Sequence, residues 1–576
     1  MFVYLYGVNV AFWDQWGIVA NLDRLASGTS MLELVWSNFT SSFLWGQNAS
    51  LHNIFFPATA MLLLASITEY NNLVEMYLIL TCFLVTFFCL LFVFRDTIKP
   101  RLHLLGLISF LPVPFLVFSL RQHENILWGF QLTLAFAQAF SVLAFYLLHV
   151  SGYTRFKKAG LLAAIGSATV ATYSAAPGLF VWPAGLLQIL FIPAEKSTKM
   201  LRMAVWTLVG AAQWLLFLFN FSSPNDNGLH DLLNRPMKEM GSFLILSGRP
   251  LFGQESLALA SGMLLVALTV VVLLLIYKSG DFGGYSFWLS LLLFSLLVAA
   301  SITIGRNGPI WLASRYVTFS ILAWIGVYAV LVKLLFDGKS YVVAGLLGIL
   351  SVMIALSIPG SYSEGLEAGR GTGGELVQLQ NTSKNRERAA FILATYESQP
   401  EDFLGTLNPR PELVGDTAPA LESLGYNVFS EPRSQALPPP LSELSPVSSP
   451  TLYRVESVSQ VGVDQENRPI LAPENESFVE ITGWAVDAEA EDAAGGVYVK
   501  IDDKLFPAFY GTDKSGSDTE ALANRFGIPA YRHAVFERAI PVSEIGTGTH
   551  ELSVIVLTND REEYYRPDQT ITFEVR

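Results

Sequence analysis

Ten apolar runs lie between residues 73 and 359, and each is near the length that a helix needs to cross about 30 Å of hydrocarbon. With 52% hydrophobic and only 15% charged residues, the chain is too apolar for an ordinary water-soluble protein of its length. The sequence therefore predicts an α-helical polytopic membrane protein with about ten transmembrane helices. We place the spans at residues 73–94, 103–120, 126–149, 159–173, 177–194, 203–222, 257–277, 286–304, 316–336 and 341–359.

Lysine and arginine residues divide the loops between these runs into two sets. Basic residues concentrate in one set: Arg95, Lys99, Arg101, Arg155, Lys157, Lys158, Lys196, Lys199, Arg202, Lys278, Lys333 and Lys339. The loops of the other set hold mixed polar and aromatic clusters. Because positive residues favour the cytoplasmic side, we expect a multi-pass plasma-membrane protein whose polar clusters and C-terminal domain are extracytoplasmic.

Composition and charge change after residue 359. Residues 1–359 carry 19 Lys+Arg against 14 Asp+Glu, a net charge of +5, whereas residues 360–576 carry 17 against 35, a net charge of −18. The acidic part predicts a water-exposed region and argues against nucleic-acid binding. We divide the chain into an N-terminal segment (1–72), a transmembrane domain (73–359), a helical and Pro-rich extracytoplasmic linker (360–476) and a β-sandwich domain (477–576).

The β-sandwich prediction depends on residues that alternate with a period of two. Short β-branched segments separated by Gly, Asp and Asn turns indicate a small antiparallel, immunoglobulin-like sandwich. These segments are Phe478–Ile481, Val497–Ile501, Glu551–Val556 and Thr570–Phe573.

The N-terminal segment holds the first outer loop. Met1–Phe12 is apolar and aromatic but too short to span a membrane, and it lacks the charged start and cleavage site of a signal peptide. We expect a preceding helix to be missing from this chain, and an interfacial position for the stretch is the alternative. The apolar run from Pro57 to about Thr68 predicts a short membrane-associated or re-entrant helix.

Asp14 is the first residue that could carry chemistry, and it stands between Trp13 and Trp16 in the outer loop. A carboxylate there can act as a general base that deprotonates an acceptor hydroxyl, while the aromatic side chains support a sugar ring or a lipid tail. The composition alone favours the simpler interpretation, in which the tryptophans anchor the chain at the membrane interface and Asp14 is solvated.

A second polar cluster runs from Arg121 to Gln131, at the start of a predicted membrane helix. Polar groups at that depth are costly unless they are paired, so function is a fair expectation for them. A polar helix cap with aromatic packing is the alternative. We predict that five residues of this cluster bind substrate: Arg121, Glu124, Asn125, Trp128 and Gln131.

Arg306 and Arg315 form the third cluster, in one short outer loop. The planar guanidinium group suits phosphate oxygens, and two such groups could clamp a lipid phosphate. Arginines that only anchor helix ends are the alternative. No P-loop, zinc motif, nucleophile elbow or His/Cys cluster is present, so we predict no cofactor and no metal ligands.

Several strings of residues resemble a family. They are Phe12–Trp16, Trp45–Gln47 with His52–Pro57, Glu124–Gln131, Gly178–Pro183 and Gly305–Tyr316. Together they resemble a largely uncharacterised set of prokaryotic multispan proteins, which are similar to the GT-C class of membrane glycosyltransferases. The resemblance implies transfer of a sugar from a polyprenyl-phosphate carrier outside the cytoplasm, with Asp14 as the catalytic acidic residue and His52 among the substrate-binding residues. The chain departs from the pattern where His52-Asn53-Ile54 lacks an additional charged residue.

The C-terminal tail resembles a sandwich domain that is often appended to such proteins, through Gly483–Asp487, Gly496–Val499 and Gly548–Leu552. Trp484 could be a platform for a sugar, although its place within the strand pattern favours a core residue.

Three hypotheses follow. The first is a glycosyltransferase, which predicts that one cavity is lined by Asp14, His52, Glu124, Arg306 and Arg315. Its partners would be a lipid-linked sugar donor, membrane lipids and a glycan, lipid or protein acceptor of the cell envelope. The second is a transporter or flippase, which predicts internal symmetry and charged residues at mid-membrane. The third is a non-catalytic scaffold that displays the sandwich domain.

Overall fold

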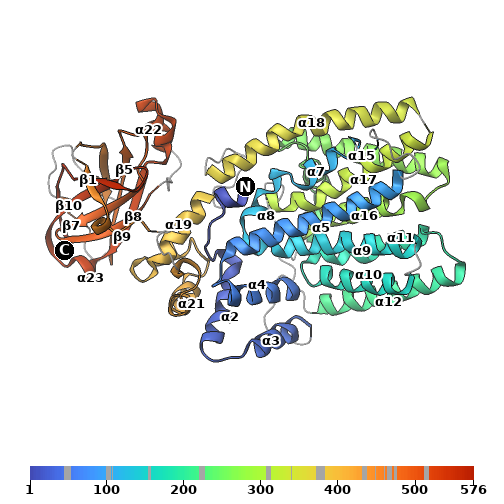
Figure 1. Cartoon of the computed structure of the whole chain (residues 1–576), viewed down its shortest axis with the longest axis horizontal. Coiled ribbons are helices and arrows are strands. Elements are labelled where there is room, and N and C mark those ends of the chain that lie inside the picture. Colours follow the sequence, from blue (N-terminus) through green and yellow to red (C-terminus); the bar gives the residue numbers. More distant parts are fainter. Residues whose placement is uncertain are drawn as a thin grey trace. The chain divides into compact units, whose positions relative to one another are not determined.

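The chain forms two compact units in the computed structural model, each assembled from several segments (Figure 1). The helical unit consists of Met1–Gly7, Thr29–Ser66 and Leu73–Asn381, and the mixed unit consists of Val8–Gly28, Ile67–Asn72 and Thr382–Arg576. The structure describes residues 1–43, 54–98, 106, 108–153, 157–219, 228–306, 313–338, 340–370, 383–430, 437–447, 449–459, 461–462, 470–471, 477–510 and 518–575.

Seven helices within these described ranges are long and apolar enough to cross a membrane, so the chain is a multi-pass membrane protein. They are α5 (Asn72–Ile98), α9 (Leu132–Tyr153), α12 (Lys196–Phe219), α15 (Glu255–Ser279), α16 (Ser286–Gly305), α17 (Val317–Gly338) and α18 (Tyr341–Arg370). The prediction of about ten spans is confirmed for these seven.

The remaining apolar runs form shorter elements. The predicted spans at 159–173 and 177–194 are the helices α10 (Lys157–Thr172) and α11 (Val181–Phe191), of 16 and 11 residues. The short run after the first outer loop is helix α4 (Phe55–Ile67), as predicted. In the predicted span 103–120, the described residues from Ile108 onward form turns and the six-residue helix α7 (Pro112–Val117). Two of these six residues are prolines, which cannot donate backbone hydrogen bonds, so a continuous helix is disfavoured there.

Helix α18 continues past residue 359, where the sequence analysis ended the last span. It contains Pro359 and runs to Arg370. Glycines on its C-terminal half allow a close approach of the segment that precedes α8: a Cβ atom added to Gly365 would lie 2.5 Å from the Cβ atom of Leu120. Residues 360–370 therefore belong to the packed helical unit, because they find partners inside it.

Contacts at one end of the helical unit join the elements that carry the basic residues. Lys333 pairs with Asp281 at 3.4 Å and with Asp337 at 2.7 Å, so the C-terminal ends of α15 and α17 are neighbours. The Trp288 indole donates to Thr97 Oγ1 at 3.1 Å, which places the start of α16 beside the end of α5. The end of α5, the connection between α15 and α16, and the end of α17 thus meet at a common end of the bundle, which carries the basic residues Arg95, Lys278 and Lys333.

The mixed unit begins with helices. Helix α2 (Trp16–Ala26) packs against α21 (Pro411–Leu424), and α19 (Ser383–Ala394) lies within the predicted helical and Pro-rich linker. Helix α20 (Glu401–Leu404) lies between α19 and α21 in the sequence. These helices come from the predicted outer loop and the predicted linker, which therefore fold together.

The rest of the mixed unit is a sheet with the strand order β1-β11-β10-β7-β8-β9-β5-β2-β3. The bounds of its strands are β1 (Ser445–Val447), β2 (Tyr453–Val458), β3 (Val461–Gly462), β5 (Phe478–Asp487), β7 (Gly496–Ile501), β8 (Lys504–Tyr510), β9 (Val535–Pro541), β10 (Gly548–Leu557) and β11 (Glu563–Tyr565). Strand β12 (Ile571–Val575) pairs with β10 and with β4 (Ile470–Leu471), and β6 (Asp492–Ala493) pairs with β5.

Buried side chains alternate along β12 and along the first half of β5, as the period of two predicts, whereas β7 and β9 are buried along most of their length. Val554 and Val556 of β10 join Ile481 of β5 and Phe536 of β9 in one hydrophobic cluster, so strands from both halves of the sheet order enclose a common core. The described strand pairs within residues 477–576 are antiparallel, as predicted. The sheet also includes β1 and β4 from the predicted linker, and there the pairs β1–β11 and β12–β4 are parallel. Helix α22 (Asp518–Phe526) also lies within this region.

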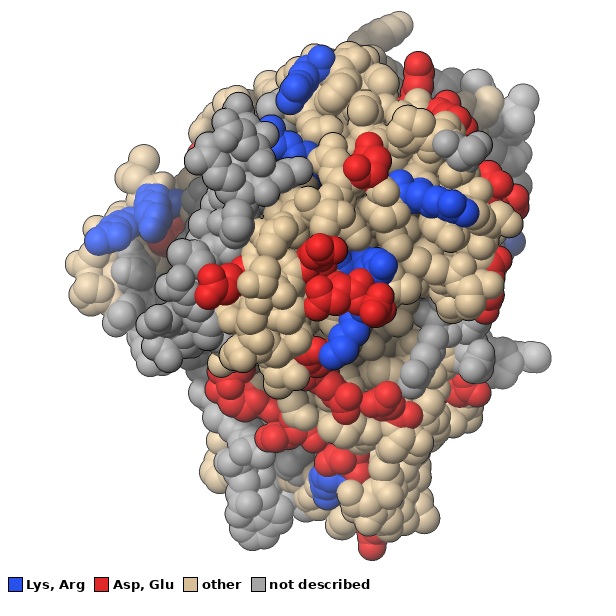
Figure 2. Space-filling model, turned by 90° about the vertical axis from the view of Figure 1, so that its left-hand side faces the viewer, with Lys and Arg blue, Asp and Glu red and all other residues tan. Residues whose placement is uncertain are grey.

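Acidic side chains are common on the face of the molecule drawn in Figure 2. Figure 2 shows Asp and Glu residues spread over much of the described face, with fewer Lys and Arg residues among them. This distribution agrees with the net charge of −18 calculated for residues 360–576. A face of this kind is well solvated and repels polyanions.

Candidate functional site

The polar segment Ser119–Gln131 is the centre of the candidate site in the helical unit. Three short helical turns build it: η3 (Leu120–Gln122), α8 (His123–Leu127) and η4 (Gly129–Gln131). The Ser119 hydroxyl caps the first turn by accepting the Arg121 amide N–H at 3.3 Å, and the extended Trp128 separates the second turn from the third. Because helical periodicity is interrupted, polar side chains of this segment are buried in succession rather than on one face.

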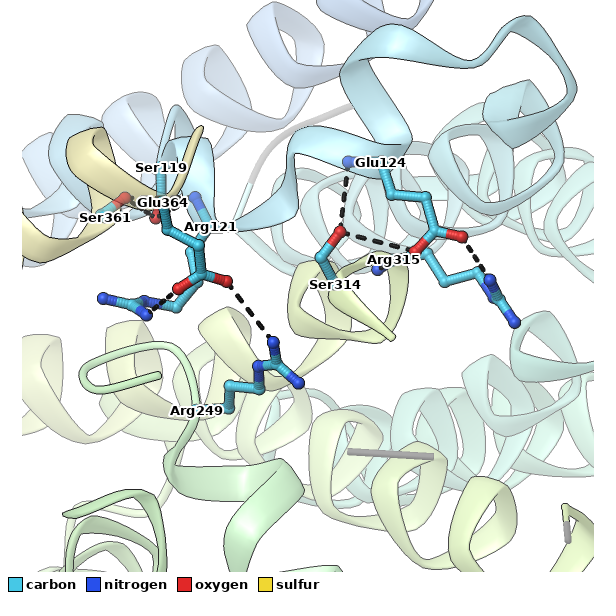
Figure 3. Close-up of polar contacts among 8 residues, drawn as sticks. All are labelled: Ser119, Arg121, Glu124, Arg249, Ser314, Arg315, Ser361 and Glu364. Atoms are coloured by element: carbon cyan, nitrogen blue, oxygen red, sulfur yellow. Dashed lines mark hydrogen bonds and ion pairs between the residues drawn. The ribbon is translucent and has the colours of Figure 1, made fainter. Parts of the chain in front are cut away.

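Glu124 and Arg315 form the first ion pair of the site, although they lie 191 residues apart in the sequence (Figure 3). The Glu124 carboxylate accepts from the Arg315 guanidinium and from the Arg315 amide N–H at 3.3 Å. Ser314, in the turn η8 (Ser314–Tyr316), accepts the Glu124 amide N–H at 3.1 Å. The Asn125 side chain donates to the Arg315 carbonyl at 2.8 Å. The predicted second and third clusters therefore meet.

Glu364 of α18 forms the second ion cluster, with Arg121 and Arg249. Figure 3 shows the two guanidinium groups approaching the carboxylate from two sides, and the Arg249 Nη2–Glu364 Oε1 distance is 3.4 Å. The side chains of Arg121, Arg249 and Glu364 are each at most 3% exposed. Ser361, one helical turn before Glu364, accepts the Arg121 amide N–H at 3.1 Å.

Charge is unevenly matched across these two clusters. Three guanidinium groups face two carboxylates, which leaves one positive charge in excess among these residues. Burial lowers the pKa of Arg121, and the nearby Glu364 carboxylate partly offsets that effect. Arginine remains charged under such conditions because its ordinary pKa exceeds 12. These five side chains taken together therefore carry a net charge of +1.

The other predicted residues of the helical unit have different surroundings. Arg306 caps the C-terminal end of α16 and is half-exposed. Trp128 is buried and packs against Phe130, with ring centroids 5.8 Å apart. Gln131 is also buried, and its amide N–H donates to the Trp128 carbonyl at 2.9 Å. His52 lies outside the described residues.

Asp14 belongs to the mixed unit and lies in the turn η1 (Trp13–Gln15). Its side chain is exposed, whereas Trp16 is completely buried. The interpretation of Trp16 as an interface anchor was therefore wrong, because this indole is part of the core of the unit. Trp484 is also mainly buried, and it packs with Tyr531 and Phe526, which confirms the core interpretation of that residue.

Two charged residues of the site were missed by the sequence analysis. Arg249 is the one charged residue between Glu239 and Glu255, a signal that could have identified it. Glu364 was assigned to the linker because the apolar run ends near residue 359. Only the continuation of α18 shows that Glu364 is buried.

Comparisons with known proteins leave the family of the chain open. No family model matches the chain, and no solved structure matches it. An uncharacterized protein of Archaeoglobus fulgidus is 26% identical to it over 244 residues, which cover 38% of this chain and 60% of the relative. The chain thus matches less than two thirds of that relative's length. Function has to be argued from the residues themselves, and the resemblance to the GT-C class stays a prediction.

Proposed function

We propose that the chain is a membrane glycosyltransferase of the GT-C type. It would transfer a sugar from a polyprenyl-phosphate-linked donor to a glycan, lipid or protein acceptor on the extracytoplasmic face of the plasma membrane. The main support is the excess of guanidinium groups over carboxylates in the buried clusters around Glu124 and Glu364. A lipid-linked phosphate supplies the negative charge that this region can accommodate.

The chemistry of the transfer defines a role for each group. The acceptor hydroxyl attacks the anomeric carbon, the bond from that carbon to the phosphate oxygen breaks, and Asp14 takes the hydroxyl proton. The polyprenyl phosphate leaves with the bonding electrons, and fixed guanidinium groups stabilise its charge. One displacement of this kind inverts the configuration of the sugar.

Arg249 now joins Arg306 and Arg315 as a phosphate-binding candidate. Arg315 and Arg121 each have a carboxylate at contact distance, whereas Arg249 shares Glu364 with Arg121. The substitution Arg249→Gln would therefore remove the excess charge while leaving the Arg121–Glu364 and Arg315–Glu124 pairs in place. Glu124, Asn125, Trp128 and Gln131 keep their proposed role in binding the sugar.

Donor binding by the purified protein in lipid nanodiscs tests this assignment. With a radiolabelled polyprenyl-phosphate sugar, Arg249→Gln should weaken binding about 10- to 100-fold, because it removes a charge-assisted contact of about 1.5–3 kcal/mol. Arg202→Gln is the matched control, since Arg202 is also buried but donates to the Ser151 carbonyl at the basic end of the bundle. Equal binding by the two variants would refute the phosphate role of Arg249.

Turnover tests the role of Asp14. Asp14→Asn keeps the shape of the side chain but cannot accept a proton, so transfer should fall about 10²–10⁴-fold while donor binding is retained. Normal turnover by this variant would exclude Asp14 as the base. Donor binding without any transfer by the unaltered protein would favour the transporter hypothesis.

The sheet domain is proposed to be an immunoglobulin-like sandwich. The support is its shared core, to which β5 and β9 contribute together with β7 and β10. In this proposal the domain is displayed outside the cell with the candidate catalytic turn.

A further inference from the structure

The turn that carries Asp14 is held in a strained conformation by residues from far along the chain. Trp13 has a φ angle of +53°, a left-handed conformation that is uncommon for a bulky residue. Its amide N–H donates to the Leu407 carbonyl at 2.6 Å, and its carbonyl accepts from the Asn408 side chain at 2.9 Å. Conformations of this kind persist only where the surrounding structure enforces them.

Asn408 is itself fixed in orientation. Its side-chain oxygen accepts the Arg410 amide N–H at 2.9 Å, which directs the amide nitrogen toward the Trp13 carbonyl. Both polar atoms of the Asn408 side chain are thus used, and the residue is 7% exposed. The backbone of Trp13 is consequently bound on both its donor and its acceptor side.

A second asparagine binds the chain on either side of the Asp14 turn. Asn427, whose φ angle is +59°, donates from its side chain to Asn72 Oδ1 at 2.7 Å and to the Tyr70 carbonyl at 3.0 Å. Its side-chain oxygen accepts the Ala11 amide N–H at 3.2 Å. One buried side chain thereby connects the segment before Asp14 with the segment before α5.

We propose that Asn408 is a positioning residue for Asp14, and that residues 383–430 are a structural part of the catalytic centre rather than a linker. This inference depends on the proposed function for its catalytic part only. The hydrogen bonds of Asn408 and Leu407 to Trp13 hold the neighbouring peptide, and with it the direction in which the Asp14 side chain leaves the backbone. A displacement of about 1 Å of a catalytic group can cost about 10²-fold in rate, so loss of this anchor should reduce turnover strongly.

The substitution Asn408→Asp tests the anchor with minimal change of shape. It keeps the oxygen that accepts from Arg410 and replaces the donor to Trp13 with an oxygen that repels the Trp13 carbonyl. Asn21→Asp is the matched control, because Asn21 lies in the same unit and donates in the same way to a backbone carbonyl, that of Gly17 at 3.2 Å. Asn408→Ala, which removes both contacts without adding charge, is the second variant.

Two measurements separate the anchor from the chemistry. Hydrogen–deuterium exchange of the amides of residues 12–16 in the full-length protein should accelerate in Asn408→Asp and not in Asn21→Asp. Unchanged exchange in both Asn408 variants would overturn the anchoring role, whether or not the chain is a glycosyltransferase.

Turnover and donor binding complete the test. In Asn408→Asp, kcat should fall about 10- to 100-fold while the Kd for the radiolabelled polyprenyl-phosphate sugar stays within about twofold. Accelerated exchange with unchanged kcat would show a purely structural role and overturn the positioning role. Failure of the proposed function would appear differently, as absent transfer in the unaltered protein with the exchange result intact.

Discussion

Removal of the Glu364 carboxylate should destabilise the helical unit more than removal of the Glu124 carboxylate. In Glu364→Gln, the side chains of Arg121 and Arg249, 3% and 1% exposed, would face each other without a carboxylate between them. In Glu124→Gln, the uncompensated side chain would be Arg315, which is 29% exposed and lies over the Tyr316 ring at 5.1 Å. Water can solvate the second cation but hardly the first two.

The magnitudes follow from this difference in burial. Breaking a buried ion pair by removing one partner typically costs about 3–5 kcal/mol, and we expect Glu364→Gln near the upper end because two cations lose one anion. Loss of a hydrogen bond to a charged and partly solvated group costs about 1–3 kcal/mol, the range expected for Glu124→Gln. The double variant Glu364→Gln/Arg249→Gln should regain part of the loss, since it removes one of the two uncompensated charges.

Unfolding by SDS in mixed micelles measures these free energies of unfolding. Thermal unfolding followed with a thiol-reactive dye ranks the stabilities of the variants independently. The dye needs no added label, because Cys82 and Cys89 are both buried in α5 and become reactive on unfolding. A Glu364→Gln variant that is as stable as Glu124→Gln, or a double variant less stable than Glu364→Gln, would refute the reasoning.

Two further predictions concern packing and topology. Helix α14 (Pro236–Gly248) packs against α15. Gly248→Ala should destabilise this pair of helices by about 1–3 kcal/mol, because the added Cβ atom would lie 1.9 Å from the Ala258 carbonyl oxygen. Gly241 lies in the same helix, and a Cβ atom added there would meet no atom within 4 Å, so Gly241→Ala should stabilise the helix by up to about 1 kcal/mol. Equal effects of the two substitutions on thermal unfolding would contradict the packing argument. In a cysteine-free background, an impermeant thiol reagent added to intact cells should label a cysteine at Asp568 but not one at Lys158. Labelling of both from outside would contradict the topology.

The sequence by itself determined the class of the protein. Apolar runs of sufficient length required a membrane, since only a helix satisfies its own backbone hydrogen bonds in hydrocarbon. Alternating β-branched residues after Ser477 determined strands in the same way, because both signals are periodic and local. The convergence of Glu124 with Arg315 was also expected from the sequence, as two polar clusters in loops of the same predicted side.

Local patterns failed where a distant partner decided the conformation. The run 103–120 gave the length of a span, but its described part turns and breaks at prolines. Residues 360–370 lost their apolar pattern and still form helix, because their glycines pack closely against Leu120 and Tyr6. Hydropathy measures the cost of exposure to lipid and carries no information on such contacts.

The tertiary structure alone decided which charges are paired and what holds the candidate base. Glu364 lies 243 residues from Arg121, and Asn408 lies 395 residues from Trp13. No periodicity connects positions so far apart in sequence, so their pairing depends on how helices and turns pack. The physical reason is that a buried charge or a strained peptide is tolerable only beside its partner, and the partner is supplied by the fold.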